Sequence, residues 1–159
     1  MTLPPCDDVT LGDWRVLFAP DVAPSVDPFR QRRRCDREGG GVLLGEVADG
    51  VLLVTRASHP TPLDRRSRRH FVRHQASAQQ AIDLAHAESG GRWTYLGEWH
   101  THPARTASPS GQDHRMIRRQ HEVNDVPAGV LLLLILGLRS DYLGLWDGSS
   151  LCARRCRLN

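Results

Sequence analysis

The segment from residue 92 to residue 121 constrains the fold more than any other part of the chain. Between Arg92 and Trp99, aromatic or apolar residues alternate with polar ones, which predicts a strand running into His100. Pro103 cannot donate a hydrogen bond to a neighbouring strand, so we expect the strand to end there. After a short loop, Ser110 is expected to begin a helix that runs to about residue 121.

Two histidines, His100 and His102, lie two positions apart on the predicted strand. Their side chains therefore point to the same face and can reach one ion, while Thr101 points away. Asp113 falls in the first turn of the predicted helix. Two imidazoles and one carboxylate can hold a zinc ion and leave its fourth position open for water, as in catalytic zinc sites. The sequence thus predicts a metallohydrolase in which His100, His102 and Asp113 bind Zn²⁺.

Each half of this pattern also has a purely structural explanation. A His-X-His pair on a surface strand occurs often by chance. Ser110 and Asp113 also match an N-cap serine followed by an acid at the third helical position, which needs no function. Together, and with Pro103 fixed after the pair, the two halves favour the metal site.

The motifs His100-Thr101-His102-Pro103 and Ser110-Gly111-Gln112-Asp113 resemble those of the JAMM (MPN+ or JAB) zinc metalloproteases. Ser110 is the seventh residue after Pro103, and Asp113 lies eleven positions after His102, as in that family. The family's upstream Glu-X-Gly-Gly-X-Leu-X-Gly segment has a counterpart over residues 38–45. The resemblance implies an α/β, cytidine-deaminase-like JAMM domain over residues 1–159, with a mostly antiparallel central sheet flanked by helices.

A narrower resemblance adds an expected substrate. Gly97 to Pro103, with Pro60, Asp64, Phe71 and Arg73 upstream, is similar to the small JAMM peptidases of bacterial CBASS antiphage operons. Those enzymes remove a nucleotide cyclase that is conjugated through its C-terminus to other proteins. The resemblance implies an isopeptidase whose partner is a protein substrate with an exposed C-terminal tail, either that cyclase or a ubiquitin-like protein conjugate.

The resemblance also implies roles for two further residues. Glu38 would take a proton from a zinc-activated water and pass it to the leaving amine, and Ser110 would donate a hydrogen bond to the oxyanion. The residues alone leave other bases open. Glu98 lies on the same predicted strand face as both histidines and is a candidate base or a supporting partner of the metal ligands. Glu46 is a weaker candidate.

Two other functions use the same residues. One is the maturation of a ubiquitin-like or sulfur-carrier precursor, which needs the same site and a different partner. The other is a metal-free JAMM scaffold without activity. The presence of the complete set of ligating and catalytic residues favours an enzyme over a scaffold.

The rest of the chain reads as strands and helices of one domain. Val130 to Leu138 is the most apolar run and predicts a buried central strand. The sequence further predicts strands over 14–18, 142–146 and 151–157, a hairpin over 41–57 that turns at Asp49-Gly50, and helices over 29–35 and 75–88, with a polar loop over 59–69.

Charge and cysteine content narrow the class of protein. All 21 basic residues are arginines, but the net charge is only +3 and acids lie among them, so we expect no nucleic-acid partner. The apolar run is too short to cross a bilayer, which predicts a cytoplasmic protein without a membrane segment. The spacing of Cys6, Cys35, Cys152 and Cys156 makes a disulfide framework unexpected, and free, at least half-buried thiols are predicted. The sequence does not specify the oligomeric state.

Overall fold

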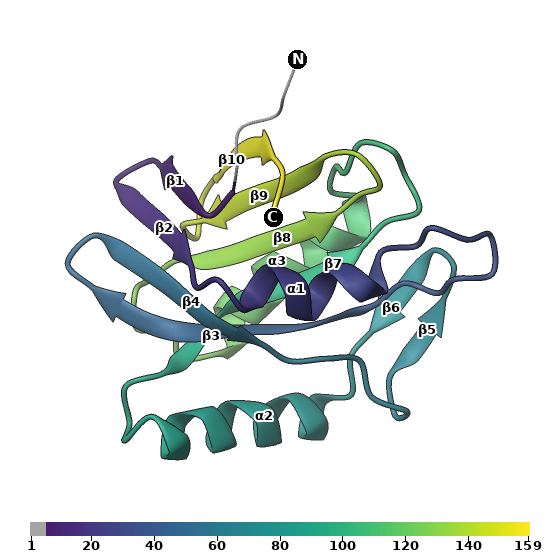
Figure 1. The fold of residues 1–159 in the computed structure, drawn as a ribbon. Coiled ribbons are helices and arrows are strands. Elements are labelled where there is room, and N and C mark those ends of the chain that lie inside the picture. The colour runs from purple at the N-terminus through teal and green to yellow at the C-terminus, as the bar shows by residue number, and fades with distance from the viewer. Residues whose placement is uncertain (1–5) are drawn as a thin grey trace.

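The computed structural model describes residues 6–159, which form a large twisted sheet with helices on both faces (Figure 1). The sheet has eight strands in the order β1-β2-β4-β3-β7-β8-β9-β10. Its strands are β1 (Asp8–Leu11), β2 (Trp14–Phe18), β4 (Val51–Ala57), β3 (Gly40–Ala48), β7 (Thr94–Thr101), β8 (Leu131–Leu136), β9 (Asp141–Trp146) and β10 (Leu151–Cys156). A separate hairpin joins β5 (Arg65–Ser67) to β6 (His70–Val72).

Most neighbouring strands run antiparallel, as predicted. The exceptions are the pairs β2–β4 and β7–β8, which are parallel. Strand β7 is central: it pairs with β3 on one side and with β8 on the other. The strand that carries His100 and ends one residue before His102 is therefore held on both edges.

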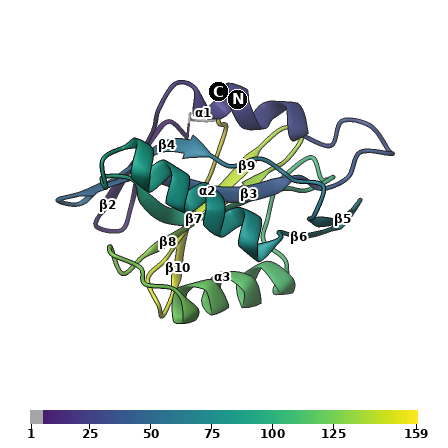
Figure 2. The same cartoon turned by 90° about the horizontal axis from the view of Figure 1, so that it is seen from below.

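The helices are divided between the two faces of the sheet. Helix α1 (Val22–Val26), followed by a 3-10 turn over Asp27–Phe29, packs on one face, where Val22 and Val26 join a large apolar cluster. Helices α2 (Gln75–Glu88) and α3 (Gly111–Val123) pack on the other face (Figure 2). The result is a three-layer arrangement.

Strand β8 shows why the apolar run of the sequence is continuous. Leu132, Leu134 and Leu136 point into the apolar cluster beneath α1, and the alternate residues Leu131, Leu133 and Ile135 point into the cluster beneath α2 and α3. A strand with helices over both faces buries every side chain, so alternation of polar and apolar residues disappears.

Most predicted elements are confirmed, two predictions are wrong, and strands β1 and β6 were not predicted. The helix expected over residues 29–35 lies earlier in the chain, because Val22, Ala23 and Val26 supply the apolar contacts. After Phe29 the backbone becomes extended at Arg30, whose side chain is buried against Asp141. The expected polar loop over 59–69 contains β5.

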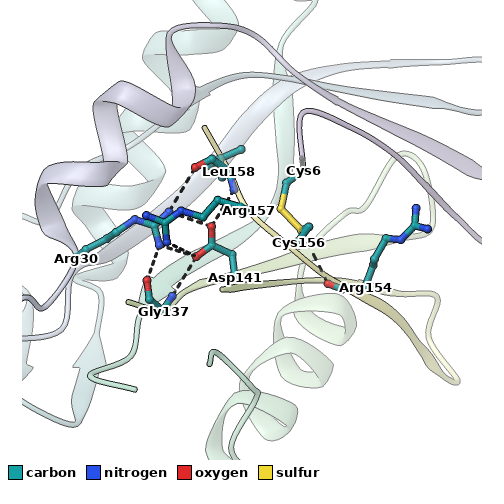
Figure 3. Close-up of a disulfide and its surroundings, with 8 residues drawn as sticks. All are labelled: Cys6, Arg30, Gly137, Asp141, Arg154, Cys156, Arg157 and Leu158. Atoms are coloured by element: carbon teal, nitrogen blue, oxygen red, sulfur yellow. Dashed lines mark hydrogen bonds and ion pairs between the residues drawn. A yellow bond between two sulfur atoms is a disulfide. The ribbon is translucent and has the colours of Figure 1, made fainter. Parts of the chain in front are cut away.

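The prediction for the cysteines is also wrong. Cys6 and Cys156 form a buried disulfide that joins the N-terminal segment to the last strand (Figure 3). These two residues are 150 positions apart, so no local pattern indicates the pairing. Cys35 and Cys152 are free, but they are exposed rather than buried.

None of the helices formed by residues 6–159 combines the length and apolar character that a bilayer crossing requires.

Candidate metal centre and active site

The end of β7 and the start of α3 bring His100, His102 and Asp113 together. The Nε2 atoms of the two imidazoles are 3.1 Å apart. The carboxylate of Asp113 lies 3.0 Å from His100 Nε2 through Oδ1 and 3.3 Å from His102 Nε2 through Oδ2. Two imidazole nitrogens and the two carboxylate oxygens of one aspartate therefore point at one small volume.

These distances can be compared with what a metal requires. Ligand atoms about 2.0–2.2 Å from a tetrahedral zinc ion lie roughly 3.3 Å from one another. The nitrogen–nitrogen distance of 3.1 Å and the distance from each imidazole to its nearer Asp113 oxygen, 3.0 and 3.3 Å, are within a few tenths of an ångström of that value. The donor set of two neutral nitrogens and one carboxylate also suits zinc. The residues present thus fit a divalent cation with an open coordination position.

Local structure fixes Asp113. Ser110 is the N-cap of α3, and its backbone N–H and hydroxyl donate to Asp113 Oδ2 at 2.7 and 2.9 Å. The Asp113 backbone N–H donates back to Ser110 Oγ, which completes a capping box. The structural and the metal-binding explanations of this motif are therefore compatible, because the cap aims the carboxylate at the histidines.

Electrostatics in the cluster favour an ionised aspartate. Burial alone would raise the pKa of Asp113, but hydrogen bonds from His100 and His102 outweigh it and hold the pKa well below its usual range. Burial would lower the pKa of His102, yet the hydrogen bond to Asp113 and its charge raise it. The cluster thus attracts positive charge, either as protons on imidazole or as a cation.

Glu38 enters the site from the segment just before the neighbouring strand β3. Gly40 is paired with His100 across the ladder, which places the residue preceding Gly39 beside the histidines. Thr101, which points away from the cluster, accepts a hydrogen bond from Gly39 N and donates to Gln31 Oε1, both on the opposite face. The backbone of Glu38 is held by the β5–β6 hairpin, through Ser67 O and the Arg66 side chain.

Glu38 is largely buried, but its side chain lines the cleft and its carboxylate makes no hydrogen bond to another residue among 6–159. Burial raises the pKa of Glu38 to about 7, and the nearby imidazoles of His100 and His102 partly oppose this shift. A carboxyl group with such a pKa exchanges protons readily near neutral pH. A cation bound beside it would favour the charged form.

Glu98, the other candidate base, is fully engaged elsewhere. Arg73 binds both of its carboxylate oxygens at 2.8–3.0 Å, and the Tyr95 hydroxyl donates to Oε1 at 2.6 Å. Within residues 6–159 neither metal-site imidazole hydrogen-bonds to it. Glu98 therefore lines the cleft as one half of an ion pair with Arg73. Glu46 contacts Trp93 and Arg92 at the other end of the ladder.

Sequence reasoning missed Tyr95 because it assumed regular alternation along β7. The pairing of β3 with β7 shifts register between Leu43 and Leu44, opposite Gly97 and Tyr95. Gly97 has a φ of +157°, and a Cβ there would lie 2.1 Å from Leu132 O. This irregularity turns Tyr95 to the same face as Glu98. Gly97 was the available signal, since an isolated glycine in a strand often marks a bulge.

The site opens into a cleft of about 590 Å³ between α2 and α3. Glu38, the three-residue cluster and Ser110 line one end of it. Ser110 is exposed and its hydroxyl donates to Asp113 in the structure. The five residues singled out by sequence thus meet at a cleft large enough for an extended peptide.

Comparison with known proteins identifies relatives that match most of this chain. A CD-NTase/cGAS isopeptidase of Vibrio cholerae is 35% identical over 133 residues, which cover 84% of this chain and 83% of its own. A probable metalloprotease of Sinorhizobium fredii is 33% identical and covers 71% of each chain. A protein of Desulfitobacterium hafniense, solved in solution, shares the fold with a TM-score of 0.64 at 23% identity, over 91% of this chain and 92% of its own.

The relatives carry the names of hydrolases, which supports a hydrolase role here, and the metalloprotease name suggests a metal. The sequence model of a protein family, described as prokaryotic homologues of the JAB domain, matches residues 29–142 of this chain. That range contains Glu38, both histidines, Ser110 and Asp113. The chain belongs to the family of prokaryotic JAB-domain homologues.

Proposed function

We propose that this chain is a zinc-dependent isopeptidase that cuts after the C-terminal tail of a conjugated protein. The observation that carries the proposal is the convergence of His100, His102 and Asp113 at separations of 3.0–3.3 Å, with Glu38 lining the same cleft. The relatives named CD-NTase/cGAS isopeptidases support a CD-NTase, a nucleotide cyclase of antiphage defence, as the conjugated protein.

Each residue has a defined task in this reaction. Zinc held by the two imidazoles and the carboxylate would polarise the scissile carbonyl and lower the pKa of a water ligand to about 7. Glu38 accepts the proton of the attacking water and then protonates the leaving amine, and its buried carboxylate has no competing partner among residues 6–159. Ser110 donates to the developing oxyanion when its hydroxyl turns from Asp113 toward the cleft.

The Glu98–Arg73 ion pair supports the site without taking part in proton transfer. Arg73 donates hydrogen bonds to Glu98, a residue of β7, and to Gln120, a residue of α3. It therefore links the strand to the helix that carries Asp113. Tyr95 satisfies the same carboxylate. Hydrogen bonds from Arg73 and Tyr95 occupy both oxygens of this carboxylate, which leaves Glu38 as the carboxylate free to contact a water in the cleft.

Metal content gives the first test. Purified protein should carry about one zinc ion per chain by elemental mass spectrometry, and His100→Ala should lose it. His114→Ala is the matched control, because His114 lies one position beyond Asp113 on α3 and outside the cluster. Zinc retained by His100→Ala at the level of the control would contradict the ligand set.

Cleavage gives the second test. The C-terminal tail of a CD-NTase is fused to a reporter, and a small β-grasp protein is fused to the same reporter in parallel. The proposal expects cleavage of the CD-NTase fusion by the zinc-loaded protein. Cleavage of the β-grasp fusion alone would support precursor maturation instead, and cleavage of neither would support a scaffold.

A further inference from the structure

The cleft that leads away from the candidate metal centre has walls of different charge. On the α2 side, its lining residues are the uncharged Gln75, Gln79 and Ile82. On the α3 side, Arg115 and Arg119 line it, four positions apart and hence on one face of the helix. Arg69, between β5 and β6, adds a third guanidinium.

These three arginines are not used by the fold. Within residues 6–159, no ion pair or side-chain hydrogen bond engages the guanidinium of Arg69, Arg115 or Arg119. Arg73, in the same cleft, differs because Glu98 and Gln120 occupy its donors. Three guanidinium groups whose N–H donors have no partner among residues 6–159 thus line the cleft that contains the candidate metal centre.

The acids of the cleft do not neutralise this charge. Glu98 is bound by Arg73 and Tyr95, and Asp113 belongs to the metal cluster. Glu38 is buried at the end of the cleft beside the same cluster. Beyond the metal centre, the cleft therefore presents positive charge to whatever enters it.

We propose, on the basis of the isopeptidase function above, that Arg115 and Arg119 select a substrate tail with an acidic side chain close to the cleaved bond. Arg69, on the turn between β5 and β6, adds a third guanidinium to the selection. Guanidinium binds carboxylate through paired, charge-assisted hydrogen bonds, and neutral or basic side chains lose them.

Helix geometry predicts where in the tail the acid lies. Arg115 and Arg119 follow Asp113 by two and six positions on α3. At about 1.5 Å of rise per residue, they lie roughly 3 and 9 Å along the helix axis from the metal ligand. An extended peptide advances about 3.3 Å per residue, so the selected acid is one to three residues from the cleaved bond.

The remaining lining of this stretch suits the rest of an extended tail. Met116 and Val123 lie on the same face of α3, and Val123 is 65% exposed. Ile82 faces them from α2. Successive side chains of an extended peptide alternate in direction, so an acid beside the arginines leaves its neighbours to contact apolar surface.

The test is a scan of tail charge. In the CD-NTase tail–reporter fusion, each of the three positions next to the cleaved bond is changed in turn to Asp, Asn and Lys. We expect kcat/KM for Asp to exceed that for Asn by about tenfold at one position at least, the value of one charge-assisted hydrogen bond. Lys should be cleaved more slowly than Asn there.

Variants of α3 assign the effect. In Arg115→Gln/Arg119→Gln, the Asp-to-Asn ratio should fall to about one. Arg118→Gln is the matched control, because Arg118 lies on the same helix but stacks on Trp146 at 5.2 Å, outside the cleft, and should keep the preference. Arg119→Glu should invert the preference in favour of Lys.

Binding provides a readout apart from turnover. A fluorescently labelled tail peptide with Asp at the preferred position should bind the Glu38→Gln protein, and its affinity should fall with added salt and in the double arginine variant. Equal cleavage of Asp, Asn and Lys tails, or a preference that survives Arg115→Gln/Arg119→Gln, would overturn the inference and leave the isopeptidase proposal standing. Failure to cut any tail would overturn both.

Discussion

Two buried clusters of polar groups lie in different parts of the sheet, and they differ in how completely their atoms are paired. One is the candidate metal centre, where His100, His102 and Asp113 converge beside Glu38. The other is the Arg30–Asp141 cluster near the chain ends, in which Arg30 and Asp141 bind one another and the backbone of Gly137 and Leu158 (Figure 3).

The Arg30–Asp141 cluster is saturated. The Asp141 carboxylate accepts two hydrogen bonds from Arg30 and one each from Gly137 N and Leu158 N. Arg30 also donates to Gly137 O and to Asp27. Both side chains are almost completely buried, at 2% and 0% exposure. A buried ion pair is tolerated only with such complete pairing.

The candidate metal centre is paired less evenly. Asp113 accepts hydrogen bonds from Ser110 and lies 3.0–3.3 Å from both imidazoles, but the Glu38 carboxylate has no hydrogen-bond partner among residues 6–159. Charge on a largely buried carboxylate without a partner is costly, and such groups are typical of functional sites. The comparison of Glu38 with Asp141 teaches that burial alone does not distinguish a reactive from a structural carboxylate, whereas the count of hydrogen bonds separates these two.

The most direct test of this comparison replaces each carboxylate, that of Glu38 and that of Asp141, by the corresponding amide. Glu38→Gln should lower kcat by about 10²–10⁴-fold, because the proton acceptor is lost. Zinc content and the midpoint of urea unfolding should stay close to wild type, since no hydrogen bond to Glu38's carboxylate among residues 6–159 is broken. Elemental analysis, denaturation and the fusion assay are read on one preparation. Full activity in this variant would move the base to Glu98.

Asp141→Asn should have the opposite signature. The amide removes the charge opposite Arg30 and places an N–H₂ where Gly137 N or Leu158 N now donates. We expect a loss of about 3–5 kcal/mol in the free energy of unfolding, measured by urea titration. The folded fraction should still bind zinc and cleave the fusion. An unfolding free energy close to wild type would show that full pairing is not what holds this cluster.

The disulfide stabilises the same region by a covalent route. Replacing Cys6 and Cys156 by serine opens a link between residues 150 positions apart. The expected loss is about 2–5 kcal/mol, with kcat/KM of the folded protein unchanged, because the link lies at the edge of the sheet. Cys35→Ser/Cys152→Ser is the matched control, since both thiols are exposed. A melting temperature insensitive to the Cys6 and Cys156 replacements would contradict this role.

The contrast also explains which parts of the molecule the sequence could predict. His100, His102 and Asp113 lie within one strand–loop–helix unit, so strand periodicity and a helix cap place them together. Helix α2, the hairpin of β3 and β4, and strand β8 follow from equally local patterns. Local physics was sufficient for these elements, but not for the short strands β1 and β5, although their partners β2 and β6 are near in sequence.

Long-range partners were beyond such reasoning. Glu38 reaches the histidines only because β3 pairs with β7, and the residues alone left Glu98 and Glu46 as rivals until a family resemblance selected among them. The burial of Arg30 against Asp141, 111 positions away, displaced the expected helix after Phe29. The disulfide is the extreme case, since both of its cysteines looked unremarkable in sequence.

Ser110 combines a structural and a proposed catalytic role in one side chain, because it caps α3 and lines the cleft. Ser110→Ala should lose about 1 kcal/mol of stability through the cap and should also slow cleavage. Ser110→Asn restores a capping acceptor but not the hydroxyl, and Ser110→Thr restores both. If the oxyanion role is right, Asn recovers the unfolding midpoint but not kcat, and Thr recovers both. Recovery of kcat by Asn would mean that Ser110 acts only by aiming Asp113.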